Sequence, residues 1–218
     1  MINNASNHNL EAMSLRSKVS LSQSKRILDL EQLSPAAKFF INPADDCDIP
    51  SLGAMLASRI SNLRADQSAL ERVHAHSRSV LAIRNRRGLA GCLAALLLNH
   101  KGLRELLSGQ LSVGDPNPLD LARPGEQASA IYVWALCLPG VAVAATANLV
   151  QWFEQPFYAN ADFYARPATL KGLAFLIRTG FNPIIGNSGS PLWVYHRQKR
   201  LNKTGNVPLH ALPHASLI

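Results

Sequence analysis

Residues 130–150 form the stretch AIYVWALCLPGVAVAATANLV, which lies within the longest uncharged run of the chain. Its length suits a membrane-spanning helix, which needs about 20 apolar residues. However, Pro139 and Gly140 stand in its middle, and a proline removes a backbone donor and clashes with the preceding turn. Lipid offers no replacement for the lost hydrogen bond. We therefore expect two separate elements and no transmembrane segment, with a membrane-inserted or peripheral protein as the alternative.

The two halves of this stretch have different structural preferences. Residues 130–138 are rich in β-branched and aromatic side chains, which predicts a buried strand. Residues 141–153 are rich in alanine, which favours a helix. A strand that passes through a glycine turn into a helix presents free backbone N–H groups at the start of the helix. This pattern predicts an anion site, most naturally for phosphate; a packed core without a ligand is the competing interpretation.

Charge and composition favour one globular domain with basic tails. The chain has 218 residues, of which 47% are hydrophobic, and a formal net charge of +8. Residues 1–26 hold four basic side chains and one acidic, and residues 197–218 hold four basic and none acidic. The remainder is nearly neutral, so we expect no nucleic-acid binding by the core. We predict disordered basic tails at 1–34 and 198–218, a folded domain at 35–197, and a cytoplasmic protein.

Neither the cysteines nor the histidines suggest a metal site. Cys47, Cys92 and Cys137 are widely spaced among apolar residues, which is typical of buried, reduced thiols. His74 and His76 have no cysteine or carboxylate beside them, so we interpret both as surface histidines rather than metal ligands.

Apolar periodicity and turn residues predict the other elements. For the helix after the first strand, Asp46 or Asp48 is the expected cap, Pro50 fits the first turn, and the end is expected near Leu63. Residues 89–98 also suit a helix by propensity, but Gly88 and Gly91 favour a hairpin. The predicted strands are 38–41, 79–84, 89–98, 162–166 and 191–196, and the predicted helices are 69–76, 102–107 and 169–179, the last ended by Gly180.

The order of these elements resembles the acetyl-CoA-dependent N-acyltransferase superfamily, GNAT. FFINPADDCDIPSLGAM is similar to that family's first strand and first helix. LPGVAVAA stands where the family has its pyrophosphate loop, Q/R-x-x-G-x-G/A. TLKGLAFLIRTGFNPI resembles the closing signature N-x-x-A-x-x-x-Y-x-x-x-G-F. The resemblance covers residues 38–196 and implies a single α/β domain of the α+β type, with a mixed central sheet flanked by helices.

The resemblance also implies which residues bind the coenzyme. The backbone N–H groups of Gly140, Val141, Ala142, Val143 and Ala144 would hold the pyrophosphate, and a main-chain donor near Leu138 would hold the thioester carbonyl. Thr169 replaces the family's asparagine, and Leu176 replaces the tyrosine that reprotonates the leaving thiolate. The loop keeps only one glycine.

Acyl transfer to an amine needs a base and a proton donor. Glu126, just before the central strand, is the candidate base, and Tyr164 is the candidate substitute for the missing acid. A solvated loop charge and a core aromatic are the respective alternatives. Arg166 and Lys171 are candidate partners of the coenzyme's phosphates, or simply exposed cations.

These features predict an acyl-CoA-dependent N-acyltransferase that uses acetyl-CoA or another acyl-CoA as co-substrate and an unidentified amine as acceptor. Leu176 favours a second hypothesis, a catalytically degenerate module that binds acyl-CoA or a partner protein. The sequence leaves the acyl chain length and the oligomeric state open.

Overall fold

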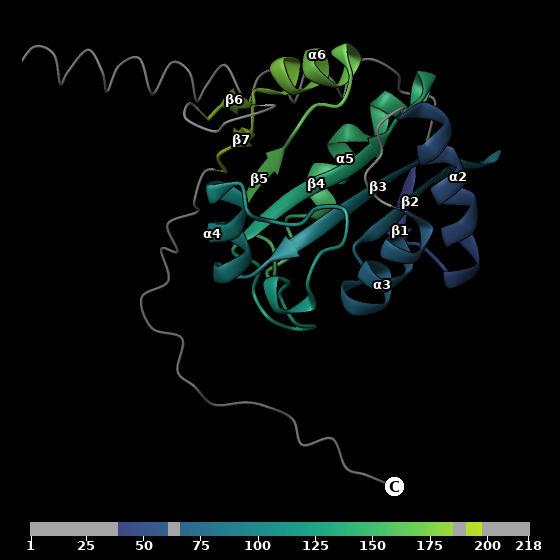
Figure 1. Cartoon of the computed structure of the whole chain (residues 1–218). Helices are drawn as coiled ribbons and strands as arrows, with labels where there is room; N and C mark the ends of the chain where they lie inside the picture. The colour runs from purple at the N-terminus through teal and green to yellow at the C-terminus, as the bar shows by residue number, and fades with distance from the viewer. Residues whose placement is uncertain (1–38, 61–65, 185–190, 198–218) are drawn as a thin grey trace, which may run out of the picture.

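The structure is a computed structural model that describes residues 39–60, 66–184 and 191–197. Its central feature is a seven-stranded mixed sheet (Figure 1). The strand order is β1-β2-β3-β4-β5-β7-β6. Every pair is antiparallel except β4 and β5, which are parallel. The strands are β1 (Phe40–Pro43), β2 (Val80–Asn85), β3 (Gly88–Leu98), β4 (Ala130–Cys137), β5 (Asp162–Ala165), β6 (Asn182–Pro183) and β7 (Trp193–Tyr195).

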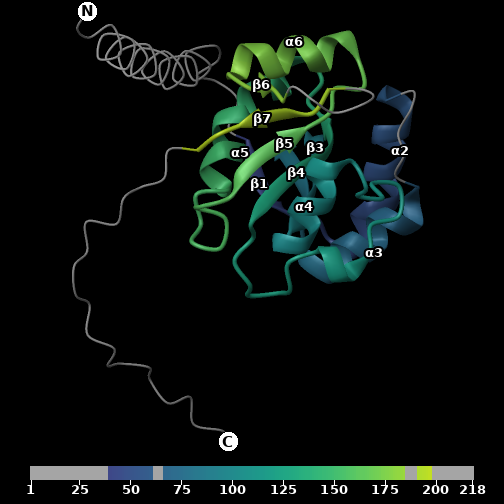
Figure 2. The same cartoon turned by 60° about the vertical axis from the view of Figure 1, so that its left-hand side comes forward.

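Helices cover both faces of this sheet. Helix α5 packs on one face with α6 beside it, and α2, α3 and α4 pack on the other (Figure 2). The α-helices are α2 (Ile49–Arg59), α3 (Gln67–Ser77), α4 (His100–Ser108), α5 (Thr146–Trp152) and α6 (Leu170–Thr179). Short 3-10 helices are η1 (Asp46–Asp48), η2 (Pro118–Asp120) and η3 (Gly140–Ala145). The predicted fold class, one α/β domain with a mixed sheet between helices, is confirmed.

Strand β3 shows why the hairpin prediction is right. Residues 91–98 are buried without interruption, as in a central strand covered on both faces. Alternate side chains enter different cores: Leu93, Ala95 and Leu97 contact the α5 side, whereas Cys92 and Ala94 face α2. An amphipathic helix would leave one side of this segment in water. Burial of both faces in the sheet therefore outweighs the helix propensity of these residues.

Most other predicted elements are confirmed, with local differences. Helix α2 ends at Arg59, and the expected end at Leu63 lies outside the described residues, as do the predicted tails 1–34 and 198–218. Strand β6 was not predicted, because a two-residue strand has no period. Residues 141–153 do not form one α-helix: the segment begins as η3 and becomes α-helical only at Thr146.

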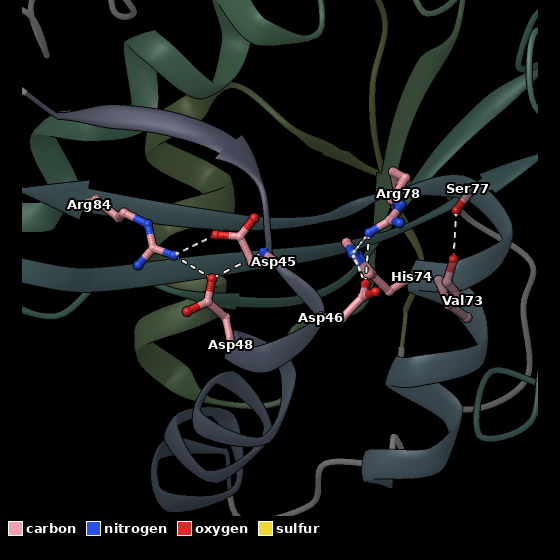
Figure 3. A network of polar contacts seen from close by, with 8 residues as sticks. All are labelled: Asp45, Asp46, Asp48, Val73, His74, Ser77, Arg78 and Arg84. Carbon is pink, nitrogen blue, oxygen red and sulfur yellow. Dashed lines mark hydrogen bonds and ion pairs between the residues drawn. The ribbon is translucent and has the colours of Figure 1, made fainter.

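A polar network fixes the connection from β1 to α2 against α3 and β2 (Figure 3). Asp48 occupies the N-cap position of α2 but makes no side-chain cap there; its carboxylate instead binds the Arg84 guanidinium of β2 and accepts from the Asp45 N–H. Arg78 donates to Asp46 at 2.8 Å and lies 3.0 Å from Nε2 of His74. The predicted capping carboxylates thus serve tertiary contacts.

Two of the predicted burial states are wrong. His74 is only 1% exposed, because α3 turns it toward the sheet, so it is not a surface histidine. Burial and the neighbouring Arg78 lower the pKa of His74, while Asp46 acts in the opposite direction. Cys47 is exposed in η1, because this short turn lies outside the core. Cys92 and Cys137 are buried free thiols as predicted, and burial raises the pKa of Cys92 to about 12.

Candidate functional site

An apolar groove opens where β4 and β5 part, between these strands and helices α5 and α6. Its cavity volume is about 80 Å³. Aliphatic and aromatic side chains dominate the lining, with two threonines and one tyrosine among them. The described lining residues are Leu93, Val133, Leu136, Thr146, Leu149, Val150, Phe153, Phe163, Phe175, Thr179, Phe181 and Tyr195.

Two features of the strands create this groove. The β4–β5 ladder runs only from Ala130 to Val133, because β5 ends at Ala165 and Pro167 soon follows, whereas β4 continues to Cys137. In addition, β4 carries a bulge opposite β3: Ala94 pairs with Ala135 and Ala95 pairs with Val133, which leaves Trp134 as the extra residue. A bulge re-aims side chains and is frequent beside functional sites. Here it returns Leu136 to the α5 side after Val133.

The polar groups of the lining are nearly all engaged. The Thr146 hydroxyl donates to the Val143 carbonyl at 2.7 Å, and the Thr179 hydroxyl donates to the Phe175 carbonyl at 2.9 Å. Tyr195 is therefore the one ionisable side chain among the described lining residues. Burial raises the pKa of Tyr195, while the charge of Arg197 acts against this, so the phenol stays protonated at neutral pH.

The glycine turn predicted as a phosphate loop adjoins this groove. Gly140 has φ 56°, a left-handed conformation that favours glycine, and a Cβ there would meet no atom within 4 Å. The turn continues as η3 and leads to Thr146 and Leu149 in the groove wall. The Ala142 N–H already donates to the Pro139 carbonyl at 3.1 Å. In a 3-10 helix this leaves the N–H groups of Gly140 and Val141 without an intrahelical partner.

The other predicted coenzyme-binding residues surround this turn or cap α6. Leu138 is half-buried against the α5-side core, Ala142 is buried, and Val143 and Ala144 are half-buried in η3. Their N–H groups follow the i to i+3 pattern, so η3 offers fewer free donors than the α-helix we predicted. Thr169 is exposed and caps α6, because its hydroxyl oxygen accepts from the Gly172 N–H at 3.0 Å.

The structure places the candidate base Glu126 at the opposite end of β4 from the glycine turn and outside the described groove lining. Its carboxylate accepts from the Arg123 N–H at 2.9 Å and closes an exposed turn just before β4. The glycine turn follows the other end of β4, whose eight residues at about 3.3 Å each put some 25 Å between the two. Glu126 and Gly140 are therefore not brought together.

The candidate acid Tyr164 lies on the opposite face of the sheet from the groove. It is 7% exposed, pairs with Tyr132 across the β4–β5 ladder, and packs in the core under α3 and α4. Burial, assisted by the nearby Asp162 charge, raises the pKa of Tyr164. Its neighbour in sequence, Phe163, points into the groove instead, because successive strand residues face opposite sides.

The remaining candidate residues, which lie in or shortly before α6, are also outside the described groove lining. Leu176, at the position of the family's tyrosine, is buried at 6% exposure and is absent from the described groove lining. Lys171 is exposed on α6. Arg166 follows the last residue of β5 and precedes Pro167, and its side chain is half-buried. Its Nε is buried without a hydrogen-bond partner among the described residues.

Comparison with protein-family models gives no match for this sequence, and comparison with curated proteins gives none either. Within residues 39–60, 66–184 and 191–197, no helix combines the length and apolar character that a membrane crossing needs. The same ranges contain no cluster of three or more His, Cys, Asp or Glu side chains suited to a metal ion.

Sequence reasoning missed the aromatic wall of the groove. Phe153 follows the end of α5, Phe163 is in β5 and Tyr195 is in β7, and each looks like an ordinary core residue in its own segment. Their rings meet in edge contacts, with centroids 5.2 Å apart for Phe153 and Phe163 and 6.4 Å apart for Phe163 and Tyr195. Only the position of β7 beside β5 brings Tyr195 to the other two.

Proposed function

We propose that this protein is an acyl-CoA-dependent N-acyltransferase with a GNAT-like domain. One observation carries the proposal: the apolar groove opens between the parted strands β4 and β5, and the turn that begins at Gly140 leads through η3 to Thr146 in the groove wall. An acyl-pantetheine chain is long and narrow, has methylene groups between two amides and a hydroxyl, and carries a pyrophosphate at its far end. The apolar lining suits the acyl and methylene groups, and the edge of β4 beyond Val133, which does not pair with β5, offers backbone groups to the amides. A left-handed glycine turn lets the backbone approach the phosphates closely.

The groove lining supplies a proton donor for this chemistry. When the neutral amine attacks the thioester carbonyl, a C–N bond forms and the C–S bond breaks. The sulfur leaves as a thiolate that takes the phenol proton, and the nitrogen gives up its proton to water, from which the phenol is reprotonated. A phenol in an apolar wall keeps its proton until a thiolate lies beside it. Tyr195 is the tyrosine that faces the groove, whereas Tyr164 and Leu176 are absent from its lining. We therefore assign the role of proton donor to Tyr195.

A non-catalytic acyl-CoA-binding module is the second candidate function. It is favoured by the location of Glu126 and Tyr164, neither of which contacts the groove, and by the buried Leu176. The groove and the glycine turn serve binding equally well in this version. Release of free CoA thiol from acetyl-CoA in the presence of an amine panel separates the two functions, because the binding module gives none.

Titration calorimetry with CoA, acetyl-CoA and longer acyl-CoAs tests the proposal. We expect saturable binding with a negative heat-capacity change, because apolar surface is buried. Val150→Phe adds a ring to the groove wall and should weaken binding, whereas Ile177→Phe adds a comparable volume on the exposed side of α6 and should not. A folded protein that shows neither binding heat nor a rise in Tm at millimolar CoA would refute the proposal.

A further inference from the structure

The tip of the β2–β3 hairpin carries two arginines whose side chains pair with no residue that the structure describes. Asn85 pairs with Gly88, so Arg86 and Arg87 alone form the loop. The Asn85 side-chain oxygen accepts from the Arg87 N–H at 2.8 Å, and Gly88 adopts φ 106°, which together fix a tight turn. Both arginines are exposed, and neither makes an ion pair or side-chain hydrogen bond with any described residue.

The charges around this turn leave it strongly cationic. Arg84, the other arginine of the hairpin end, is neutralised by Asp48, with Asp45 at 3.8 Å. No acidic residue of the described chain pairs with the tip itself. Two guanidinium groups held on a two-residue turn present several N–H donors in a small volume, which matches a dianionic phosphate monoester.

This hairpin tip lies at the same end of the sheet as the glycine turn. Strands β3 and β4 are antiparallel with Cys92 opposite Cys137, so the start of β3 meets the end of β4. A Cβ on Gly91 would lie 2.6 Å from the Cys137 carbonyl oxygen and 3.5 Å from Leu138 Cδ2. Gly88 lies three residues before Gly91 on β3, and Gly140 lies three residues after Cys137 on the chain that leaves β4. The hairpin tip and the glycine turn therefore extend from the same contact toward the same end of the sheet.

A third cation stands near this end of β4. Arg59, in the last turn of α2, is exposed. Helix α2 contacts β4 and shares a core with Cys137, so its last turn lies on this part of the sheet. The charge of Arg59 lowers the pKa of the Cys137 thiol, against the larger raising effect of burial. The end of the sheet is thus basic, although the folded part of the chain is nearly neutral as a whole.

We propose that Arg86 and Arg87, assisted by Arg59, form a binding site for the terminal 3′-phosphate of coenzyme A. The inference rests on the proposed function, which puts the pyrophosphate at the Gly140 turn and leaves the ribose phosphate to extend past the end of β4. The turn supplies backbone N–H groups but no side-chain cation, since residues 138–150 are uncharged. A phosphate monoester needs such a cation, and the hairpin supplies it.

Binding of CoA and of dephospho-CoA, which lacks the 3′-phosphate, tests the site by calorimetry at low ionic strength. We expect the parent to bind CoA about tenfold more tightly than dephospho-CoA, the scale of one charge-assisted contact. Arg86→Gln/Arg87→Gln should lose most of this preference, because only Arg59 remains, and should keep the parent's affinity for dephospho-CoA. Arg86→Lys/Arg87→Lys should restore part of the preference. The matched control Lys171→Gln/Arg178→Gln removes two cations from α6 and should keep the full ratio.

The outcomes separate this inference from the function on which it rests. If the parent binds CoA and the glutamine variant retains the tenfold preference, or if the α6 variant loses it instead, the hairpin site is wrong and the proposed function stands. A parent that binds both ligands equally also overturns the site. A parent that binds neither ligand overturns the proposed function together with the site.

Discussion

Gly140→Val is the substitution that tests the turn after β4 most directly. Gly140 has φ 56°, and the space around its missing Cβ is open within 4 Å, so a side chain there meets a conformational cost and no steric overlap with the protein. A left-handed conformation costs a non-glycine residue about 1–2 kcal/mol. For a domain of this size, each kcal/mol lowers Tm by about 2–4 °C, which gives a fall of about 2–8 °C.

The effect on coenzyme binding is a separate quantity. A valine side chain keeps the pyrophosphate away from the N–H groups of Gly140 and Val141, and losing one or two charge-assisted hydrogen bonds costs about 1–3 kcal/mol. Calorimetry should therefore record a rise in the Kd for CoA of about 5- to 150-fold.

Gly109→Val provides the matched control. Gly109 has φ 79°, also has open space around it, and ends α4 on the opposite face of the sheet from the groove. It should lower Tm by a similar amount and leave CoA binding unchanged. Equal CoA affinities for Gly140→Val and the parent would show that the turn is merely structural and would remove residues 139–144 from the proposed site.

Three further predictions concern the groove, pH and packing. Tyr195→Phe should reduce turnover by about 100-fold or more with little change in the Kd for acetyl-CoA, and unchanged turnover would exclude Tyr195 as the acid. The fold lowers the pKa of His74 below 6.5, so the contribution of His74 to the free energy of unfolding is complete above about pH 6.5 and is lost as pH falls through the folded-state pKa. In urea unfolding, the stability of His74→Gln should therefore depend less on pH than that of the parent. Gly91→Ala forces a Cβ to 2.6 Å from a backbone oxygen and should cost about 1–3 kcal/mol, whereas Gly53→Ala in α2 meets only Leu70 at 3.6 Å and should stabilise the protein by about 0.5–1 kcal/mol.

Local signals predicted most of the elements. Pro139 and Gly140 mark the end of β4, Thr169 and Gly180 bound α6, and the polar turn at residues 85–88 joins β2 to β3. These residues act through their own backbone conformations or through hydrogen bonds to neighbours a few positions away. Such constraints depend on nearby sequence, so a sequence pattern is sufficient to recognise them.

Tertiary contacts decided the candidate site and the exceptions. The alanines of 141–147 favour an α-helix, yet packing of Ala142 and Ala145 against the core accompanies a 3-10 turn there. The side of the sheet faced by each β5 residue depends on strand pairing, which put Phe163 in the groove and Tyr164 in the other core.

The sequence by itself determined where the chain turns and which segments become strands or helices, because those choices are made within a few residues of backbone. Only the tertiary structure decided that β7 lies between β5 and β6, that β4 bulges at Trp134, and that His74 is buried. Each of these depends on contacts between segments far apart in the chain, whose free energy comes from the surface that they bury together. The groove is such a product, since its described walls come from six separate elements and from Phe153 and Phe181.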